Sequence, residues 1–372
     1  MEHELSLALV ACPGGAAFAE KIDRYLYSRY TNAKLTGTIN PQSFLVPCRH
    51  TVFANGEIKA EVGTSIRGKH VFIIQDVTNS QPIELNGTKQ RFSINDNLLS
   101  LFVTLDAVRS SGAERVSLIL PYFPYSRQHV RKGREGLTAA RISRQLEDLG
   151  ADRIITLDIH CKEIENAFRK TNLEDLHASY QILRELLYKV KRKDLMIVSP
   201  DVGGLGRNRF FANALGCRLG AIYKERDYGR TSNNAEDNNI INMRLLGNVD
   251  KATVFIADDI LGTGGTMIKA MSTIKEHGAK DILLGISLPL FNGNAIEHFD
   301  RAYDDGLFSY LIGTNGVMLP PEVLTKPWFI EADVSKFFGQ VIDRIYHNHS
   351  VTDLLDNRKM ISRLFSRHPN LE

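Results

Sequence analysis

The sequence lacks the features that mark several classes of protein. It has no run of about 18 apolar residues, so no membrane-spanning helix is expected. The four cysteines, Cys12, Cys48, Cys161 and Cys217, show no C-x-x-C spacing, and we expect reduced thiols in a cytoplasmic protein. The net charge is only +3, which is too small to indicate nucleic-acid binding by itself.

The N-terminus gives no sign of a secretion signal. Two of its first four residues are acids, and the apolar stretch that follows is interrupted by Pro13, Gly14 and Gly15. The chain has 372 residues, of which 43% are hydrophobic and 24% charged. This length and composition are typical of a globular protein with two domains of ordinary size.

Short apolar runs alternate with amphipathic helical patterns along most of the chain. This alternation is typical of α/β domains with parallel sheets. Buried strands are expected at residues 5–11, 71–74, 115–120, 153–160, 195–199 and 252–257. We predict a first domain over 1–170, a second over 171–346, and a polar tail over 347–372.

The most informative stretch is an apolar strand that ends in Asp258 and Asp259 and is followed by the small-residue loop 262–266 and a helix. Backbone N–H groups of such a loop, with the helix N-terminus behind them, can surround an anion. It is neither a Walker A loop nor a G-x-G-x-x-G fingerprint. The acids suggest a sugar phosphate or a nearby metal, and an ordinary Gly-rich turn is the alternative.

Other polar residues follow the remaining strands. A basic loop, 131–134, comes after one strand, where open α/β sheets bind anions, although a solvated charge run would look the same. His160 ends another strand and is either a metal ligand or a structural histidine. Asp201 precedes Gly203 in a second acid–Gly segment, and the polar stretch 228–242 suits a mobile lid.

The loop pattern Asp258-Asp259-x-x-x-Thr263-Gly264-Gly265-Thr266 resembles the phosphoribosyl-pyrophosphate loop of type I phosphoribosyltransferases. Six segments occur in order between about residues 50 and 345: TSIRGKHVFIIQ, NDNLL, PYFPYSRQ, GADRIITLDIH, SPDVGG and ADDILGTGGT. Together they resemble the ribose-phosphate pyrophosphokinase family, whereas ordinary phosphoribosyltransferases share only the last segment.

The resemblance implies an α/β fold of two tandem phosphoribosyltransferase-like domains, each with a mostly parallel sheet flanked by helices. It implies transfer of the pyrophosphoryl group of ATP, with Mg²⁺ as cofactor, to the anomeric hydroxyl of ribose 5-phosphate, giving PRPP and AMP. It also implies a homo-oligomer, a hexamer built from dimers. No nucleic-acid or membrane partner is expected.

The resemblance further assigns roles to residues at matching positions. Two basic residues are implied to be catalytic: Lys224 and Arg226. Two residues are implied to hold the metal: His160 and Asp201. The implied ATP-binding residues are Phe53, Asn55, Gly56, Glu57, Arg127, Gln128 and His129. The implied ribose 5-phosphate-binding residues are Asp258, Asp259, Gly262, Thr263, Gly264, Gly265 and Thr266.

Four positions depart from the family pattern: Asn55, His129, Glu163 and Gly262. Asn55 keeps an acceptor oxygen but loses a charge, and Gly262 removes a negative charge beside the expected phosphate. These departures keep open a non-catalytic regulatory subunit, and a phosphoribosyltransferase acting on a base is a further alternative. The residues that the resemblance implies to be catalytic, to hold the metal and to bind the ribose are all present, which favours an active enzyme over a non-catalytic subunit.

Overall fold

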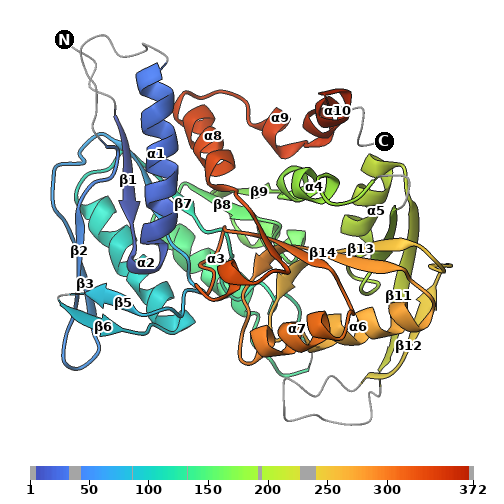
Figure 1. The fold of residues 1–372 in the computed structure, drawn as a ribbon. Helices are drawn as coiled ribbons and strands as arrows, with labels where there is room; N and C mark the ends of the chain where they lie inside the picture. Colours follow the sequence, from blue (N-terminus) through green and yellow to red (C-terminus); the bar gives the residue numbers. More distant parts are fainter. Residues whose placement is uncertain are drawn as a thin grey trace. The chain divides into compact units, whose positions relative to one another are not determined.

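The computed structural model describes residues 6–32, 43–85, 87–131, 133–191, 195–226 and 240–367 (Figure 1). The chain forms two compact units that take in distant parts of the sequence. Unit 1 comprises Met1–His177, Asn315–Met318 and Asp333–Leu355, and unit 2 comprises Ala178–Thr314, Leu319–Ala332 and Asp356–Glu372. The domain limits expected at residues 170 and 346 stay a prediction.

Unit 1 is built on a sheet of five parallel strands that lie in the same order in space as in the chain. The order is β1 (Leu7–Ala11), β4 (His70–Ile74), β7 (Arg115–Ile119), β8 (Arg153–Leu157) and β9 (Asn172–Leu176). β4 is buried along its whole length, as expected for a parallel strand covered on both faces.

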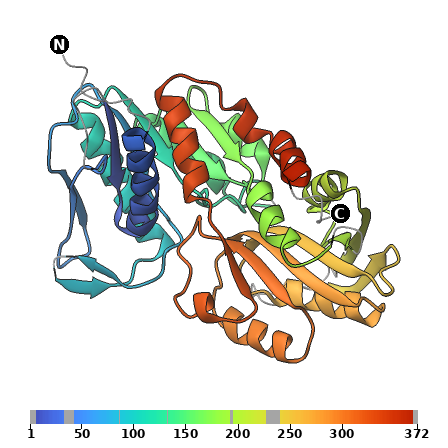
Figure 2. The same cartoon turned by 45° about the horizontal axis from the view of Figure 1, so that its top comes forward.

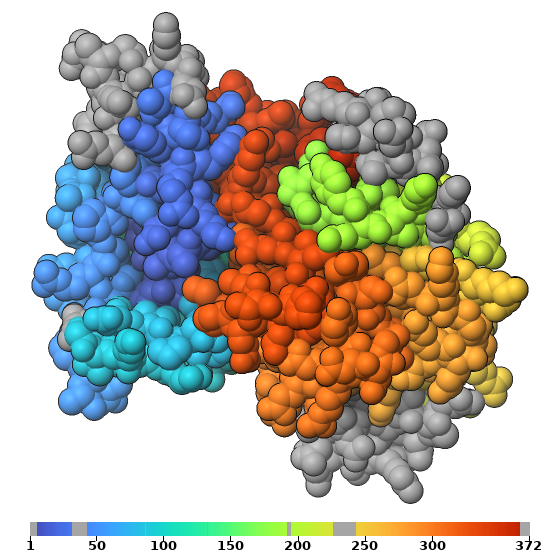
Figure 3. All heavy atoms as spheres, in the orientation of Figure 1, coloured from blue at the N-terminus to red at the C-terminus, as the bar shows by residue number. Residues whose placement is uncertain are grey.

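Helices cover both faces of the sheet in unit 1. α2 (Ile94–Ser110) and α3 (Thr138–Asp148) share one core with alternate residues of β1, β4 and β7. On the other face α1 (Ala16–Asn32) lies beside α8 (Ser335–Tyr346), in both ribbon views (Figures 1 and 2). The rings of Phe18 and Phe338 pack edge to face there, with their centroids 5.3 Å apart. The outer side of α1 lies at the surface (Figure 3).

The start of α2 is set by a capping side chain. Asn95, Asp96 and Asn97 are all residue types that cap helices, but the N-cap is the earlier residue Ser93. Its hydroxyl accepts from the Asp96 N–H, and the Asp96 carboxylate accepts from the Ser93 N–H. This reciprocal capping box satisfies two donors at once, which explains why the helix begins earlier.

Two hairpins extend from unit 1. One joins β2 (Cys48–Val52) to β3 (Ile58–Val62), and the other joins β5 (Ile83–Leu85) to β6 (Thr88–Gln90). The second hairpin lies in the segment 76–94, whose Asn, Gln, Thr and Pro residues are typical of a surface loop. Its strands have three residues each, which is too short for the apolar alternation that predicts a strand.

Unit 2 is built on a sheet of seven strands. Their order in space is β12 (Ile240–Leu246), β11 (Arg218–Arg226), β10 (Leu195–Ser199), β13 (Thr253–Leu261), β14 (Asp281–Pro289), β15 (Tyr310–Thr314) and β16 (Phe329–Ala332). All neighbours are parallel except β12, which runs antiparallel to β11. The chain therefore reverses its direction across the sheet between β10 and β13.

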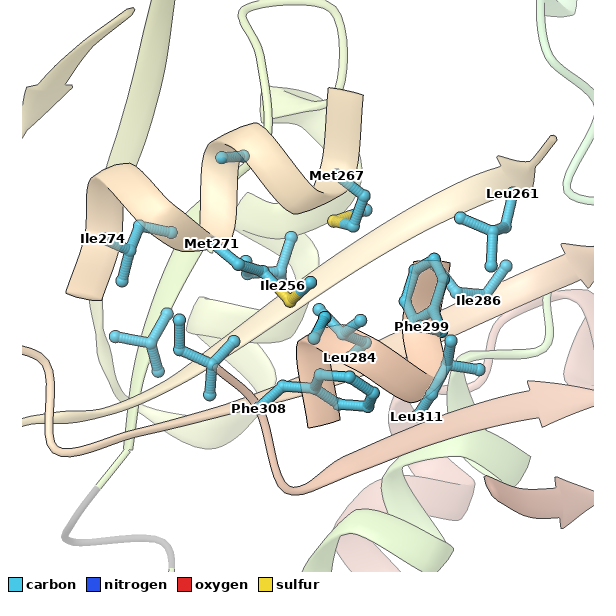
Figure 4. Close-up of a cluster of buried hydrophobic side chains, with 14 of the residues drawn as sticks. Ile256, Leu261, Met267, Met271, Ile274, Leu284, Ile286, Phe299, Phe308 and Leu311 are labelled. Atoms are coloured by element: carbon cyan, nitrogen blue, oxygen red, sulfur yellow. The ribbon is translucent and has the colours of Figure 1, made fainter. Parts of the chain in front are cut away.

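Helices also cover both faces of this second sheet. α6 (Gly265–Glu276) and α7 (Ala295–Asp304) pack on one face, where Met267, Met271 and Phe299 meet the side chains of β13, β14 and β15 (Figure 4). α4 (Ser179–Leu187) and α5 (Leu205–Leu215) contact the strands, and α10 (Arg358–Arg367), from the polar tail, packs against both.

Two expectations about the chain as a whole can be compared with the structure. In the described part of the chain, none of the helices combines the length and the apolarity needed to cross a bilayer. All four cysteines are free thiols.

Candidate active site

The reversal of strand order in unit 2 marks where a ligand is expected. Open α/β sheets bind ligands beyond the carboxyl ends of their strands, at the point where the connections turn to opposite sides. In this unit that point lies between β10 and β13, which are hydrogen-bonded neighbours. The polar residues on and just after these two strands therefore form the candidate site.

Asp201 follows β10 and has both carboxylate oxygens engaged. Oδ1 accepts a hydrogen bond from the Gly204 N–H at 2.8 Å, and Oδ2 pairs with the Lys224 Nζ of β11 at 3.2 Å. The side chain of Lys224 is only 6% exposed, whereas that of Asp201 is 41% exposed. The pair thus holds a mostly buried ammonium beside a carboxylate that a ligand can reach.

Asp258 and Asp259 form a second charged group within β13, which continues to Leu261 and so runs past the acids at which the sequence suggested that the strand ends. The Asp259 N–H donates to the Asp258 carboxylate at 3.0 Å. Burial raises the pKa of Asp258 well above its ordinary value, and the Asp259 carboxylate raises it further. Asp201 adds to this effect and Arg207 opposes it, so the charged residues that follow β10 and β13 lie close enough to influence one another.

Arg207 on α5 is a residue that sequence reasoning missed. Its Nη1 lies 3.6 Å from a carboxylate oxygen of Asp258 and 3.4 Å from one of Asp259. No local motif connects a helix residue to acids that lie about fifty positions later. Its place just after the Asp201–Gly204 segment is the one sequence signal that could have drawn attention to it.

The loop after β13 has the form expected of an anion site. Gly264 has a φ of +78°, and a Cβ there would lie 2.4 Å from the ring of Phe299, so only glycine fits. α6 begins at Gly265, and its N-cap residue, Gly264, has no side chain that could cap the helix. The Asn292 N–H holds the Gly262 carbonyl at 3.1 Å, which ties the loop to the start of α7.

In unit 1, the hairpin between β2 and β3 carries four predicted ATP-binding residues at its turn. The Phe53 N–H donates to the Glu57 carbonyl and the Gly56 N–H to the Phe53 carbonyl, both at 2.8 Å. Gly56 has a φ of +90°, and the Glu57 N–H donates to the Asn55 side chain at 3.1 Å. The Phe53 ring is 49% exposed, so the turn presents an aromatic face beside polar groups.

The other predicted ATP-binding residues follow β7. Arg127 and Gln128 are exposed. The His129 Nδ1 lies 3.1 Å from the Ser126 carbonyl, and because a carbonyl only accepts, this nitrogen carries the proton. The ring of His129 meets that of His160 edge to face, with centroids 5.4 Å apart. The structure thus brings these two predicted site residues together.

His160 follows β8 in an unusual piece of backbone. Asp158, two residues earlier, has a φ of +43°, and its carboxylate pairs with the His177 Nδ1 at 3.0 Å. On the other side, the Cys161 thiol donates to Glu163 at 2.9 Å. Non-glycine residues with positive φ concentrate at functional sites, so the backbone before His160 is of the kind that such sites contain.

The described residues include no group of three or more His, Cys, Asp or Glu side chains that could hold a metal ion. His160 belongs to unit 1 and Asp201 to unit 2, and their role as Mg²⁺ ligands stays a prediction. Mg²⁺ keeps several waters and shares phosphate oxygens, so it needs few protein ligands.

Two predictions fall partly outside the described residues. The stretch 228–242, suggested as a lid, lies there up to residue 239, and its last residues begin β12. Arg226 ends β11, but its side chain is not among those described. Its predicted catalytic role stays a prediction.

Comparisons with known proteins agree with this architecture. Residues 7–150 match the family model for the N-terminal domain of ribose phosphate pyrophosphokinase, and residues 170–324 match the phosphoribosyl transferase domain. Ribose-phosphate pyrophosphokinase of Helicobacter pylori is 34% identical over 304 residues, covering 81% of this chain and 86% of the relative. That of Chlorobaculum tepidum is 31% identical over 367 residues, covering 98% and 100%.

A solved structure has the same fold. The crystal structure of phosphoribosylpyrophosphate synthetase from Mycobacterium smegmatis aligns with a TM-score of 0.73 over 92% of this chain and 99% of that one, at 24% identity. The expected fold of two phosphoribosyltransferase-like domains is confirmed. The chain belongs to the ribose-phosphate pyrophosphokinase family.

Proposed function

We propose that this chain is a ribose-phosphate diphosphokinase. It transfers the pyrophosphoryl group of ATP to the anomeric hydroxyl of ribose 5-phosphate, giving PRPP and AMP. The observation that carries the proposal is a group of polar elements in unit 2: the Asp201–Lys224 pair, the Asp258–Asp259 pair and the Gly-rich loop lie on or just after three neighbouring strands.

Each part of this set suits one part of the sugar phosphate and its reaction. Carboxylates accept hydrogen bonds from sugar hydroxyls, so we assign Asp258 and Asp259 to binding the ribose hydroxyl groups. The loop of Gly262, Thr263, Gly264, Gly265 and Thr266, with the N-terminus of α6, takes the 5-phosphate through backbone N–H groups and the helix dipole.

Transfer to the anomeric oxygen forms a bond to the β-phosphorus of ATP and breaks the bond from that phosphorus to the oxygen that leaves with AMP. Such phosphoryl-transfer reactions depend on positioning and on neutralising the charge of the phosphate oxygens. Lys224, with Arg226, supplies positive charge to the oxygens whose charge increases. Because the Lys224 side chain is mostly buried, little water screens its ammonium.

The nucleotide is assigned to residues of unit 1. The exposed turn of Phe53, Asn55, Gly56 and Glu57 offers an aromatic face for the adenine and polar groups for its edge. Arg127 and Gln128 provide donors for the rest of ATP, and His129 joins them beside His160.

We assign Mg²⁺ as the cofactor, with His160 and Asp201 as its protein ligands. Bound Mg²⁺ neutralises phosphate charge and polarises the phosphorus for attack. The same proposal includes domain limits at residues 170 and 346, a cytoplasmic location and a hexamer built from dimers. Sedimentation of the purified chain tests the oligomeric state.

The deciding experiment incubates the purified chain with ribose 5-phosphate, ATP and Mg²⁺ and follows AMP and PRPP together. We expect both products at equal rates and a loss of about 100- to 1,000-fold in the Lys224→Ala variant, the usual effect of removing one group that stabilises transition-state charge. Lys269→Ala, an exposed lysine on α6, is the control.

AMP formation no greater than that of the Lys224→Ala variant would overturn the proposal. Nucleotide binding without turnover would then favour the non-catalytic regulatory subunit. Release of pyrophosphate from PRPP in the presence of a base would favour a phosphoribosyltransferase.

A further inference from the structure

Arg207 brings a positive charge close to Asp258 and Asp259 of β13. Its Nη1 lies 3.6 Å from Asp258 Oδ1 and 3.4 Å from Asp259 Oδ1. One guanidinium nitrogen thus lies within ion-pair distance of both carboxylates. All three side chains are largely shielded from solvent, so the interaction is weakly screened.

The next residue explains why the arginine is held at this place. Asn208 is fully buried, and its side-chain Oδ1 accepts from the Ala257 N–H at 3.0 Å while its Nδ2 donates to the Ala257 carbonyl at 2.9 Å. The same Nδ2 donates to the Gly204 carbonyl at 3.0 Å. The first turn of α5 is therefore bonded directly to the strand residue that precedes Asp258.

Two adjacent carboxylates need such a partner if both are to recognise hydroxyl groups. Like charges in a largely buried place oppose each other's ionisation. A protonated carboxyl would present a donor where a sugar hydroxyl requires an acceptor. A shared cation opposes the protonation of either acid and so favours the acceptor form of both.

We propose that Arg207 is a positioning residue for sugar recognition, which holds Asp258 and Asp259 as a pair of acceptors for the hydroxyl groups of ribose 5-phosphate. This inference rests on the proposed function. It differs from a direct role in phosphate transfer because Arg207 acts through the acids and not on the reacting phosphate.

The test compares Arg207→Met with Arg209→Met, which removes an exposed arginine from the same helix. Calorimetry measures the dissociation constants of ribose 5-phosphate, 2-deoxyribose 5-phosphate and ATP. We expect Arg207→Met to weaken ribose 5-phosphate binding about 10- to 100-fold, the effect of disturbing charge-assisted hydrogen bonds. ATP binding should stay within about twofold, and Arg209→Met should resemble the wild type.

The deoxy sugar separates positioning from a general structural effect. The wild type should bind ribose 5-phosphate more tightly than 2-deoxyribose 5-phosphate, and Arg207→Met should lose most of this preference. A loss of folding or a repulsion of the phosphate would weaken both sugars equally and overturn the inference. Arg207→Lys, which keeps the charge, should restore part of the preference and decides the matter if the Met variant does not fold.

The two proposals fail in different ways. If the wild type neither binds ribose 5-phosphate nor forms AMP, the proposed function is wrong and the inference falls with it. If the wild type does both and Arg207→Met binds both sugars as the wild type does, the positioning role alone is wrong.

Discussion

Acids end a buried parallel strand in each unit, yet they have different partners. Asp76 follows β4 in unit 1 and is only 3% exposed. One of its oxygens accepts from the Thr78 N–H at 2.9 Å and the other from the Met318 N–H at 2.6 Å. In unit 2, Asp258 and Asp259 face the cation of Arg207 instead.

The difference agrees with the order of the strands. The sheet of unit 1 runs β1, β4, β7, β8, β9 without a reversal, whereas that of unit 2 reverses between β10 and β13. A reversal opens a crevice for a ligand, and without one the polar groups after β4 bond to the protein's own backbone. An acid at a strand end is therefore informative only together with its partners.

Exchanging acids for amides should separate the two roles most strongly. Asp259→Asn removes a charged acceptor, and we expect the KM for ribose 5-phosphate to rise about 10- to 100-fold. The denaturation midpoint should hardly fall, because repulsion with Asp258 also decreases. Steady-state kinetics and urea denaturation on the same preparations measure both effects.

Asp76→Asn is the matched change in unit 1. It exchanges one acceptor oxygen of a buried carboxylate for a donor, so we expect a loss of about 1–3 kcal/mol in stability and no change in KM. If Asp76→Asn raised the KM for ribose 5-phosphate as much as Asp259→Asn does, the comparison between the two strand ends would be wrong.

Glycines provide a second, smaller test of the same contrast. A Cβ on Gly14 would lie 2.4 Å from the Asp76 carbonyl oxygen and 2.8 Å from both Gln75 Oε1 and Asn97 Oδ1. These neighbours are buried, so Gly14→Ala should destabilise the chain by about 1–3 kcal/mol through overpacking. Thermal denaturation measures the loss.

Gly265, in the loop of unit 2, has open space where a side chain would begin: among the described residues, a Cβ at this position would meet no atom within 4 Å. Alanine at this first position of α6 should stabilise the helix by up to about 0.5–1 kcal/mol, while the methyl group obstructs a phosphate approaching the backbone. We expect the KM for ribose 5-phosphate to rise about tenfold. If the Gly265→Ala variant kept the KM of the wild type, the assignment of this loop to phosphate binding would be wrong.

The sequence predicted the framework of both sheets because buried strands are short apolar runs. It also singled out Asp258 and Asp259, since two acids before a Gly-rich loop are a local pattern. Arg207 was out of reach because its partners lie about fifty residues away on another strand. Apolar spacing alone also groups Leu99 with Leu98, Leu105 and Val108 of α2. Those three are buried but Leu99 is 47% exposed, because spacing alone does not fix where the edge of a buried stripe lies.

Backbone N–H groups extend the comparison. In unit 2 the loop before α6 is the proposed phosphate site, whereas in unit 1 a carboxylate of the chain itself accepts from a turn of N–H groups. Glu147 Oε1 accepts from the N–H groups of Arg169, Lys170 and Thr171 at 2.9, 2.5 and 2.8 Å. Desolvation opposes ionisation, but these hydrogen bonds outweigh it and hold the pKa of Glu147 at about 2.

Glu147→Gln should therefore have a small, pH-dependent effect on stability and none on the kinetic constants. A carboxylate whose pKa is lowered by folding stabilises the folded state above the ordinary glutamate pKa of about 4.3, and this contribution disappears as the pH falls towards 2. We expect the variant to lose about 1–2 kcal/mol at pH 7, and the difference from the wild type to shrink below pH 4. Asp148→Asn, which removes an exposed pair with Arg169, should cost less than about 0.5 kcal/mol at any pH. If the stability difference between Glu147→Gln and the wild type stayed constant from pH 7 to pH 3, the charge of Glu147 would not be what stabilises this turn in unit 1.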